Sequence, residues 1–306
     1  MTNTSKDSEK QKNWDALRLY HYTNMHGLVG IVKSKSIWCT KIQYLNDASE
    51  YEHGFSFLKT AMLDNKQELE NARKGLTVKE KDIDSSIQEY SMLDIFVSSF
   101  TELSDTLSQW RGYASDNGVY ISFDRKKLET QASAENYSLS ECVYEGNDKK
   151  NEAEKYIKRW IEILRGDGGS FGNSNETVRL IVKCFIKHSC RFKHESFKEE
   201  KEWRLISFPK DDVLNITPNP KQVVKFRPSR TNLIPYTEFD LRTGEYPLRK
   251  TQQTDRHNEE CICIEYVHTA KSKNHKLMSY SIDELFKHEN VYLLAALESN
   301  IPFRPE

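Results

Sequence analysis

The chain has 306 residues, of which 37% are hydrophobic and 11% aromatic, so it can bury a substantial core and is expected to fold as a globular protein. Its 45 basic and 46 acidic residues give a formal net charge of −1, which excludes a basic footprint for nucleic acid over the whole molecule. Six cysteines in so long a chain do not make the disulfide framework of a small secreted domain.

The polar N-terminal residues and the distribution of apolar residues predict the domain organisation and the location of the protein. Residues 1–14 are polar and are expected to form a disordered tail, while 15–306 are expected to form a single α+β domain with helical insertions near 55–91 and 151–194. The tail lacks the apolar stretch of a signal peptide, and no segment approaches the roughly 20 apolar residues of a membrane span. We therefore expect a cytoplasmic protein with no membrane partner.

The first third of the chain predicts two strands and a helical layer. A strand at Leu17–Tyr22 precedes a helix near Met25–Lys35, where apolar residues recur at helical spacing, and a second strand follows at Ile37–Lys41. Residues 55–91 are charged, helix-forming and poor in β-branched side chains, and Gly75 is the expected break between two helices.

The rest of the chain alternates less regularly. Strands at Leu93–Phe100 and Gly118–Phe123 flank a short helix or turn at 109–112, which leads into an Asp116-Asn117-Gly118 turn. Further strands are predicted at 142–144, 202–208, 223–227, 233–239, 261–267 and 291–294, with helices at 151–164, 176–194 and 282–287. The absence of regular βαβ alternation indicates an α+β fold.

Four separated segments carry polar or ionisable side chains on or beside β-prone apolar runs. This pattern predicts strand edges that line one cleft. The segments are Leu19–Thr23, Ser98–Thr101, Gln109–Phe123 and Glu200–Arg204.

His21 is the first candidate functional residue. A single histidine in a strand is more often a packed, hydrogen-bonded core residue, but Tyr20, Tyr22 and Thr23 surround this one with groups that stack and donate hydrogen bonds. The helix start at Asn24 offers a cap suited to anchoring a polar ligand. Such a cluster suits the hydroxyl groups of a ribose better than a proton relay.

Glu200 and Glu202 are the second candidate. At the start of a strand, residues two apart emerge on one face, about 7 Å from each other at the α-carbons. A solvated charge run is the alternative, since residues 198–202 are all charged, but the switch to Trp203-Arg204-Leu205-Ile206 indicates that Glu202 begins a buried strand. A carboxylate there could orient a sugar hydroxyl or stabilise an oxocarbenium-like transition state.

Together these segments resemble a bacterial family called domain of unknown function 2971. The residues that carry the resemblance extend over nearly the whole chain and are Leu19–Thr23, Asn46, Asp47, Glu50, Ser99–Thr101, Trp110, Tyr113, Gly118, Glu200, Glu202, Arg204 and Ser299–Arg304. That family is in turn similar in pattern to ADP-ribosyltransferases, which carry histidine or arginine on the first strand, a Ser/Thr- or Tyr-bearing central strand, and glutamate on a later strand.

This resemblance implies a split mixed or antiparallel β-sheet core of ADP-ribosyltransferase type, with NAD as co-substrate and no metal. Glu202, Glu200 and His21 would be the catalytic residues, with Glu202 on the ribose 2′-hydroxyl and Glu200 aligning the acceptor. The residues implied to bind NAD are His21, Tyr22, Thr23, Ser99, Thr101, Trp110, Arg111, Tyr113 and Arg204. Phe100 departs from the Ser-Thr-Ser triplet of the transferase pattern.

The function implied is cleavage of NAD at the nicotinamide–ribose bond and transfer of ADP-ribose to a macromolecule, in a toxin or phage-defence effector that could have an antitoxin or regulatory partner. The acceptor would be a protein or a nucleic acid. Basic residues that could border a nucleic-acid acceptor, or form solvated faces, are Arg191, Lys193, Lys198, Lys221, Lys225, Arg227 and Arg230.

Two other functions stay open. One is a non-catalytic nucleotide-binding sensor with the same fold, in which Glu202 is dispensable for binding. The other is a nuclease that holds Mg²⁺ with Asp47, Glu50, Glu200 and Glu202. The spacing of Asn46, Asp47 and Glu50 also fits a helix cap, which we favour for those three.

Overall fold

The computed structural model describes residues 17–45, 48–114, 118–166, 171–208, 222–243, 259–272 and 274–301. The strands are β1 Arg18–Thr23, β2 Ser36–Lys41, β3 Phe96–Thr101, β4 Val119–Asp124, β5 Ser138–Glu141, β6 Glu202–Ile206, β7 Lys225–Pro228, β8 Leu233–Asp240, β9 Ile264–Thr269 and β10 Ala295–Glu298. The α-helices are α2 Met25–Ser34, α3 Ala48–Asp64, α4 Lys66–Ala72, α5 Glu80–Tyr90, α6 Leu107–Tyr113, α7 Arg125–Ala134, α8 Gly146–Gly166, α9 Ser174–Ser189 and α10 His275–His288, and the short 3₁₀ helices are η1 Ile42–Tyr44 and η2 Glu195–Glu200.

The strands form one mixed sheet, which confirms the predicted mixture of helices with a mixed, largely antiparallel sheet. Its order is β10-β9-β4-β1-β3-β2-β8-β7, and β6 joins β3 to β5. The pair β9–β10 is parallel, whereas the other paired strands named here are antiparallel.

The alternation of side chains along β3 and β6 assigns each residue to a face. Phe100 of β3 and its partner Trp203 of β6 belong to the core on one face, which contains α2, α7 and α10. Val97 and its partner Ile206 point to the opposite face and belong to a second core, formed with α3, α5, α8 and α9. Because side chains alternate with period two, Glu202 lies on the same face as Ile206.

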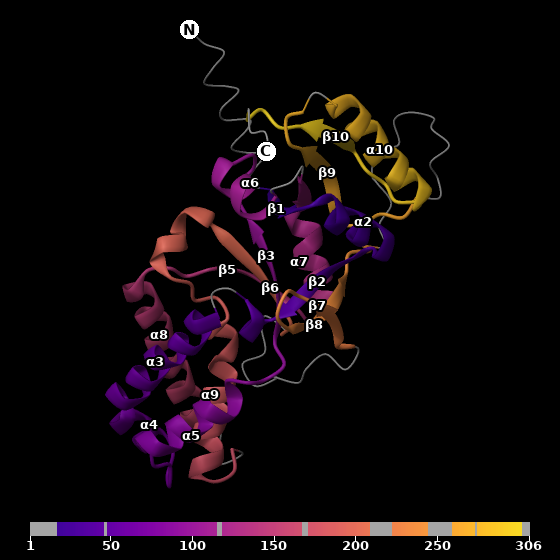
Figure 1. Ribbon diagram of the computed structural model, residues 1–306. Helices are drawn as coiled ribbons and strands as arrows, with labels where there is room; N and C mark the ends of the chain where they lie inside the picture. Colours follow the sequence, from indigo (N-terminus) through magenta and orange to yellow (C-terminus); the bar gives the residue numbers. More distant parts are fainter. Residues whose placement is uncertain are drawn as a thin grey trace.

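The second core belongs to a helical layer that stands apart from the rest of the sheet. Helices α3, α4, α5, α8 and α9 gather at the lower left of Figure 1, beside one end of β3, β5 and β6. The predicted break at Gly75 falls between α4 and α5, where its φ of 85° lies in the left-handed region that favours glycine. The helical layer leaves the other end of this sheet face uncovered for the site described below.

The sheet divides at β3. Along one edge β3 pairs with β6, while the opposite edge pairs with β1 at Thr101 and with β2 at Phe96 and Val97. Strand β1 therefore runs beside β3 at Thr101 and separates from it along residues 98–100. This divergence opens a crevice in the middle of the sheet, where a continuous ladder would leave none.

Some predicted elements differ from the structure. The strand expected at 142–144 is replaced by β5, and Val143 makes only an isolated bridge with Phe192. Helix α7 was not predicted, although Asp124 signals its start by accepting a hydrogen bond from the Lys127 backbone N–H. The expected tail at 1–14, the Asp116-Asn117 turn and 167–170 lie outside the described residues, as do Asp47 and the basic residue Lys221.

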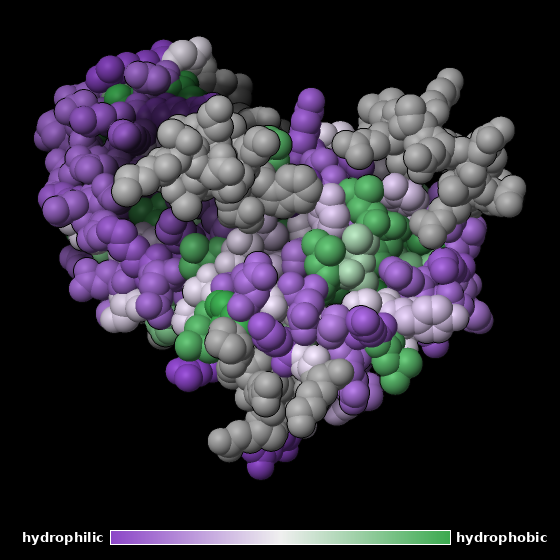
Figure 2. Space-filling view, turned by 90° about the horizontal axis from the view of Figure 1, so that it is seen from above, coloured by the Kyte–Doolittle hydropathy of each residue, from purple (hydrophilic) through white to green (hydrophobic). Residues whose placement is uncertain are grey.

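Within the described ranges, no helix is both long enough and apolar enough to cross a bilayer. The face of the molecule seen from above is mostly hydrophilic, with hydrophobic side chains gathered in a few places (Figure 2). An apolar groove of about 530 Å³ lies between α2 and α10, and its larger apolar lining residues are Met25, Leu28, Val29, Leu277, Met278, Ile282 and Leu285.

Candidate functional site

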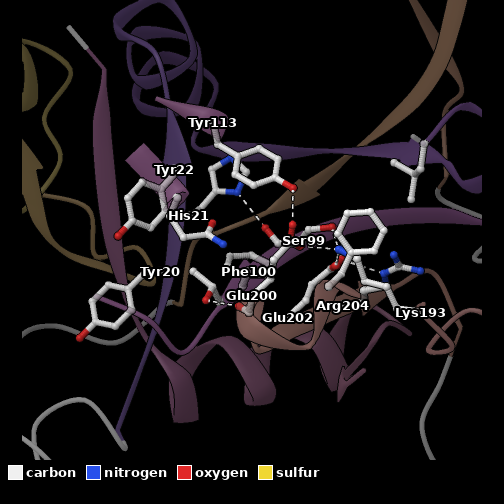
Figure 3. Close-up of a pocket in the computed structure, with 14 residues that line it drawn as sticks. Tyr20, His21, Tyr22, Ser99, Phe100, Tyr113, Lys193, Glu200, Glu202 and Arg204 are labelled. Atoms are coloured by element: carbon white, nitrogen blue, oxygen red, sulfur yellow. Dashed lines mark hydrogen bonds and ion pairs between the residues drawn. The ribbon is translucent and has the colours of Figure 1, made fainter. Parts of the chain in front are cut away.

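A pocket of about 210 Å³ opens on the uncovered sheet face, beside the crevice between β1 and β3 (Figure 3). Strands β1, β3 and β6 supply its floor, while α6 and η2 supply its rim. Its lining residues are Tyr20, His21, Tyr22, Leu45, Ser99, Phe100, Thr101, Gln109, Tyr113, Lys193, Phe197, Glu200, Glu202 and Arg204.

His21 reaches the pocket because β1 separates from β3 there. Its Nδ1 lies 2.9 Å from the carbonyl oxygen of Ser99, which can only accept, so Nδ1 carries the proton. Burial lowers the pKa of His21 and outweighs the opposing effect of that hydrogen bond, so the ring is neutral. Nε2 is then left as a hydrogen-bond acceptor, suited to a hydroxyl group of a ligand.

Glu202 is an ionised carboxylate held on three sides. Its Oε1 accepts hydrogen bonds of 2.7 Å from Ser99 Oγ and from Arg204 Nε, and its Oε2 contacts Lys193 Nζ. Its side chain is 5% exposed, and burial alone would raise its pKa. The charges of Arg204 and Lys193 outweigh burial and lower the pKa of Glu202 to about 2. The backbone N–H also donates to Tyr144 Oη, so the start of β6 is fixed as well.

Lys193 connects the two glutamates that the sequence placed side by side. Glu200 ends η2 rather than lying in the strand, and Lys201 turns the chain with a φ of 43° before β6 begins. Lys193 Nζ contacts both Glu200 Oε2 and Glu202 Oε2. The repulsion between the two acids is therefore offset by a buried cation. Burial would lower the pKa of Lys193, but the attraction of the two carboxylates outweighs burial and raises it.

Tyr113 and Thr101 fix Glu200 at the rim. Tyr113 Oη donates a hydrogen bond of 3.1 Å to Glu200 Oε1, and the carbonyl oxygen of Glu200 accepts from Thr101 Oγ1 at 2.6 Å. Burial and the charge of Glu200 raise the pKa of Tyr113 to about 12, so its phenol keeps its proton. Figure 3 shows Tyr113 reaching from α6 across the pocket toward Glu200.

The structure brings most of the predicted site residues together, and separates three from the rest. Thr23, Trp110 and Arg111 are not among the described residues that line the pocket. Thr23 ends β1 beside α2, and Arg111 is exposed on α6. Trp110 is fully buried, where it packs edge-on against the rings of Tyr22 and Tyr120.

Three lining residues, Leu45, Lys193 and Phe197, lie outside the four segments that the sequence predicts to line a cleft. Lys193 was considered only as part of a basic surface, yet its side chain is 6% exposed. Phe197 gave no signal in its charged surroundings, whereas Gln109 belongs to one of the predicted cleft segments. Arg204 was expected to grip a ligand, but its Nε and Nη1 are occupied by Glu202 and by the carbonyl oxygen of Cys190.

The acidic residues proposed to hold Mg²⁺ are only partly included in the described part of the chain. Among those residues, no group of three or more histidine, cysteine, aspartate or glutamate side chains is arranged to hold a metal ion. Asp47 lies outside that part, and the side chain of Glu50 is not described although its backbone belongs to α3. Glu200 and Glu202 share a lysine ammonium in the place where a cation would bridge them.

Comparison with known proteins gave one match. No curated protein and no solved structure matches the chain significantly. One family model does match, and its region contains α6, β4, Lys193 and Glu202. Over residues 109–205 the chain matches the family described as protein of unknown function (DUF2971), which supports the resemblance drawn from the sequence.

Proposed function

We propose that the protein is an ADP-ribosyltransferase-like enzyme that cleaves NAD at the nicotinamide–ribose bond and transfers ADP-ribose to a protein or nucleic acid. The observation that carries this proposal is the convergence of His21, Ser99 and Glu202. They come from β1, β3 and β6, which are consecutive neighbours in the sheet, and they line one pocket. A histidine, a serine and a glutamate on three such strands are what the proposed resemblance to ADP-ribosyltransferases would require.

The residues present suit a sugar whose anomeric carbon becomes electron-deficient. The nicotinamide–ribose bond breaks with its electron pair leaving on the nicotinamide nitrogen, and an acceptor nucleophile then bonds to the ribose carbon and loses its proton. Because its pKa is lowered to about 2, Glu202 is ionised at neutral pH, and its carboxylate has a lone pair left for the ribose 2′-hydroxyl. Nε2 of His21 would accept from a second hydroxyl.

The held position of Glu202 is the main contribution of its neighbours. Ser99, Arg204 and Lys193 occupy the carboxylate from three directions, so it needs no reorganisation when positive charge develops on the sugar. Lys193 donates to two carboxylates and has a third N–H, which makes it a better candidate than Arg111 or Arg204 to meet an anionic group of NAD. Glu200 and Tyr113 stand at the rim, where an acceptor would approach.

The pocket fits one end of NAD and not the whole molecule. Its volume of about 210 Å³ lies below the roughly 300–1,000 Å³ of sites that bury a drug-sized ligand. The half-exposed ring of Tyr113 and the similarly exposed ring of Phe197 flank the opening. We therefore assign the pocket to the nicotinamide riboside portion and the rim to the remainder of NAD.

The test is nicotinamide release from NAD by the unaltered protein and by Glu202→Gln, with EDTA present and a cell lysate as the source of acceptor. We expect turnover that survives EDTA and falls by roughly 10²–10³ in Glu202→Gln. Glu199→Gln is the matched control because Glu199 is exposed and lies three residues before Glu202. A thermal unfolding curve of each variant separates loss of chemistry from loss of fold.

Other results would identify the alternatives. NAD binding by calorimetry without turnover would support the non-catalytic sensor. Loss of all activity on addition of EDTA, with nucleic acid as the substrate that is consumed, would support the nuclease. Absence of both NAD binding and turnover in the unaltered protein would overturn the proposal.

A further inference from the structure

The end of the described chain is fastened to the loop that follows β3. Ser299 donates a hydrogen bond from Oγ to Asp105 Oδ1, and the backbone N–H of Asn300 donates to Asp105 Oδ2 at 2.7 Å. Ser299 is 4% exposed, and its own backbone N–H donates to the carbonyl oxygen of Thr269 in β9. Both carboxylate oxygens of Asp105 are thus used by residues almost 200 positions later in the sequence.

The same carboxylate also holds helix α6. Trp110 donates from Nε1 to Asp105 Oδ1 at 2.9 Å, and its indole fills a small core with Tyr22 and Tyr120. Ile301 packs against that core from the C-terminal segment. Asp105, which is partly buried, therefore joins the C-terminal segment and α6.

The local backbone does not hold α6 in place by itself. The helix has seven residues, and Thr106, its first flanking residue, makes no capping hydrogen bond with its side chain. So short a helix is marginal without tertiary contacts. Asp105 has a φ of 44°, in a region that a non-glycine residue adopts only where its surroundings hold it.

What α6 carries makes this junction relevant to the pocket. Gln109 and Tyr113 project from α6 into the pocket lining. The loop before it fixes a third lining residue, because Tyr22 Oη accepts from the Thr106 backbone N–H at 3.1 Å and donates to the carbonyl oxygen of Leu103 at 3.2 Å. A shift of this loop would move all three lining residues together.

We propose that Asp105 and Ser299 are positioning residues of the candidate site, which act together as a latch that sets α6 and Tyr22 against the pocket. The C-terminal segment then supports the pocket through Asp105, although none of its residues lines the pocket. This inference concerns the geometry of the pocket wall. The first test below needs no ligand, and only the second test, which uses NAD, rests on the proposed function.

The first test does not depend on any activity. Amide hydrogen exchange would be measured in the full chain for Ser299→Ala, Asp105→Asn and Asp105→Ala. Loss of one partly buried hydrogen bond to a carboxylate predicts roughly tenfold faster exchange over residues 107–113 in Ser299→Ala. Asp105→Ala should have the largest effect, since Asn keeps an acceptor and tolerates a positive φ. Ser281→Ala, which removes a hydroxyl on α10 that bonds Leu277, is the matched control.

The outcomes are distinct. Faster exchange confined to 103–113, with the helical layer unchanged, supports the latch. Exchange over α6 equal to that of the unaltered protein, or an equal acceleration in every element, overturns it. An equal acceleration in every element would mean that these contacts contribute only to the global stability of the fold.

A second measurement connects the latch with the ligand. In nicotinamide release from NAD, Ser299→Ala should raise KM several-fold with kcat changed by less than about twofold, because ground-state and transition-state contacts weaken alike. A fall in kcat with KM unchanged would contradict a positioning role through Tyr22 and Tyr113. If the unaltered protein neither binds nor turns over NAD, the proposed function fails, and hydrogen exchange alone decides whether the latch exists.

Discussion

The ammonium of Lys193 lies against the carboxylate of Glu202 in the wall of the pocket, and both side chains are almost completely buried. This contact joins the segment before η2 to the first residue of β6. Lys193 also contacts Glu200, so one cation sets the distance between the two acids. The negative charges of the two glutamates are therefore compensated by a lysine as well as by an arginine.

Lys193→Met should destabilise the fold, because it leaves two carboxylates facing each other with less compensation. Removal of one partner from a buried ion pair typically costs about 3–5 kcal/mol. We expect a loss near the lower figure in the free energy of unfolding measured with urea, since Arg204 still pairs with Glu202. Lys198→Met is the control, as its pair with Glu145 is exposed. Equal effects of both variants would show that the buried bridge contributes nothing special.

Acid should weaken the fold through Glu202. Its pKa is lowered in the folded state from an ordinary 4.5 to about 2, so its contribution is complete above the unfolded-state value and is lost as pH falls between these two values. The free energy of unfolding of the unaltered protein should therefore fall more steeply over that range than that of Glu202→Gln. Parallel pH curves for the two proteins would contradict the ionised state assigned to Glu202.

His21→Ala should weaken ligand binding, with a loss of about 1–3 kcal/mol in the free energy of unfolding because the Ser99 carbonyl loses its donor. Removal of a neutral hydrogen-bond acceptor predicts roughly tenfold weaker binding of NAD, measured by calorimetry. Since burial lowers the pKa of His21 below 6.5, affinity in the unaltered protein should stay constant down to that pH and weaken only below it. His26→Ala, at an exposed position on α2, should bind as the unaltered protein does. An affinity unchanged by His21→Ala would remove His21 from the site.

Gly118→Ala should disturb the junction of α6 with β4. A Cβ at this position would lie 2.6 Å from the carbonyl oxygen of Thr23 and 2.7 Å from that of Ala114, so the backbone must shift. We expect a loss of about 1–3 kcal/mol in the free energy of unfolding, as for other overpacked sites. Gly112→Ala offers the control, because nothing lies within 4 Å of its Cβ and alanine favours a helix. Similar stability of the two variants would show that this contact relaxes freely.

The sequence by itself determined which residues share a face and where most elements lie. Polar side chains next to apolar ones in the predicted strands Phe96–Thr101 and Glu202–Ile206 assigned Ser99 and Glu202 to the lining of a cleft before their contact was known. Gly75 likewise marked the break between helices, because its conformational freedom is a local property. Helix α7 was missed although its capping residue was visible.

Only the tertiary structure decided which of these residues meet. The separation of β1 from β3 brings His21 to the pocket, and it depends on strand pairings distant in sequence. Lys193 becomes a site residue because the folded chain places its ammonium between two acids, which a count of charges does not reveal. Trp110 is withdrawn into a core by its bond to Asp105, which Ser299 completes from the far end of the chain. Local periodicity fixes the direction of a side chain, whereas long-range packing fixes its partner.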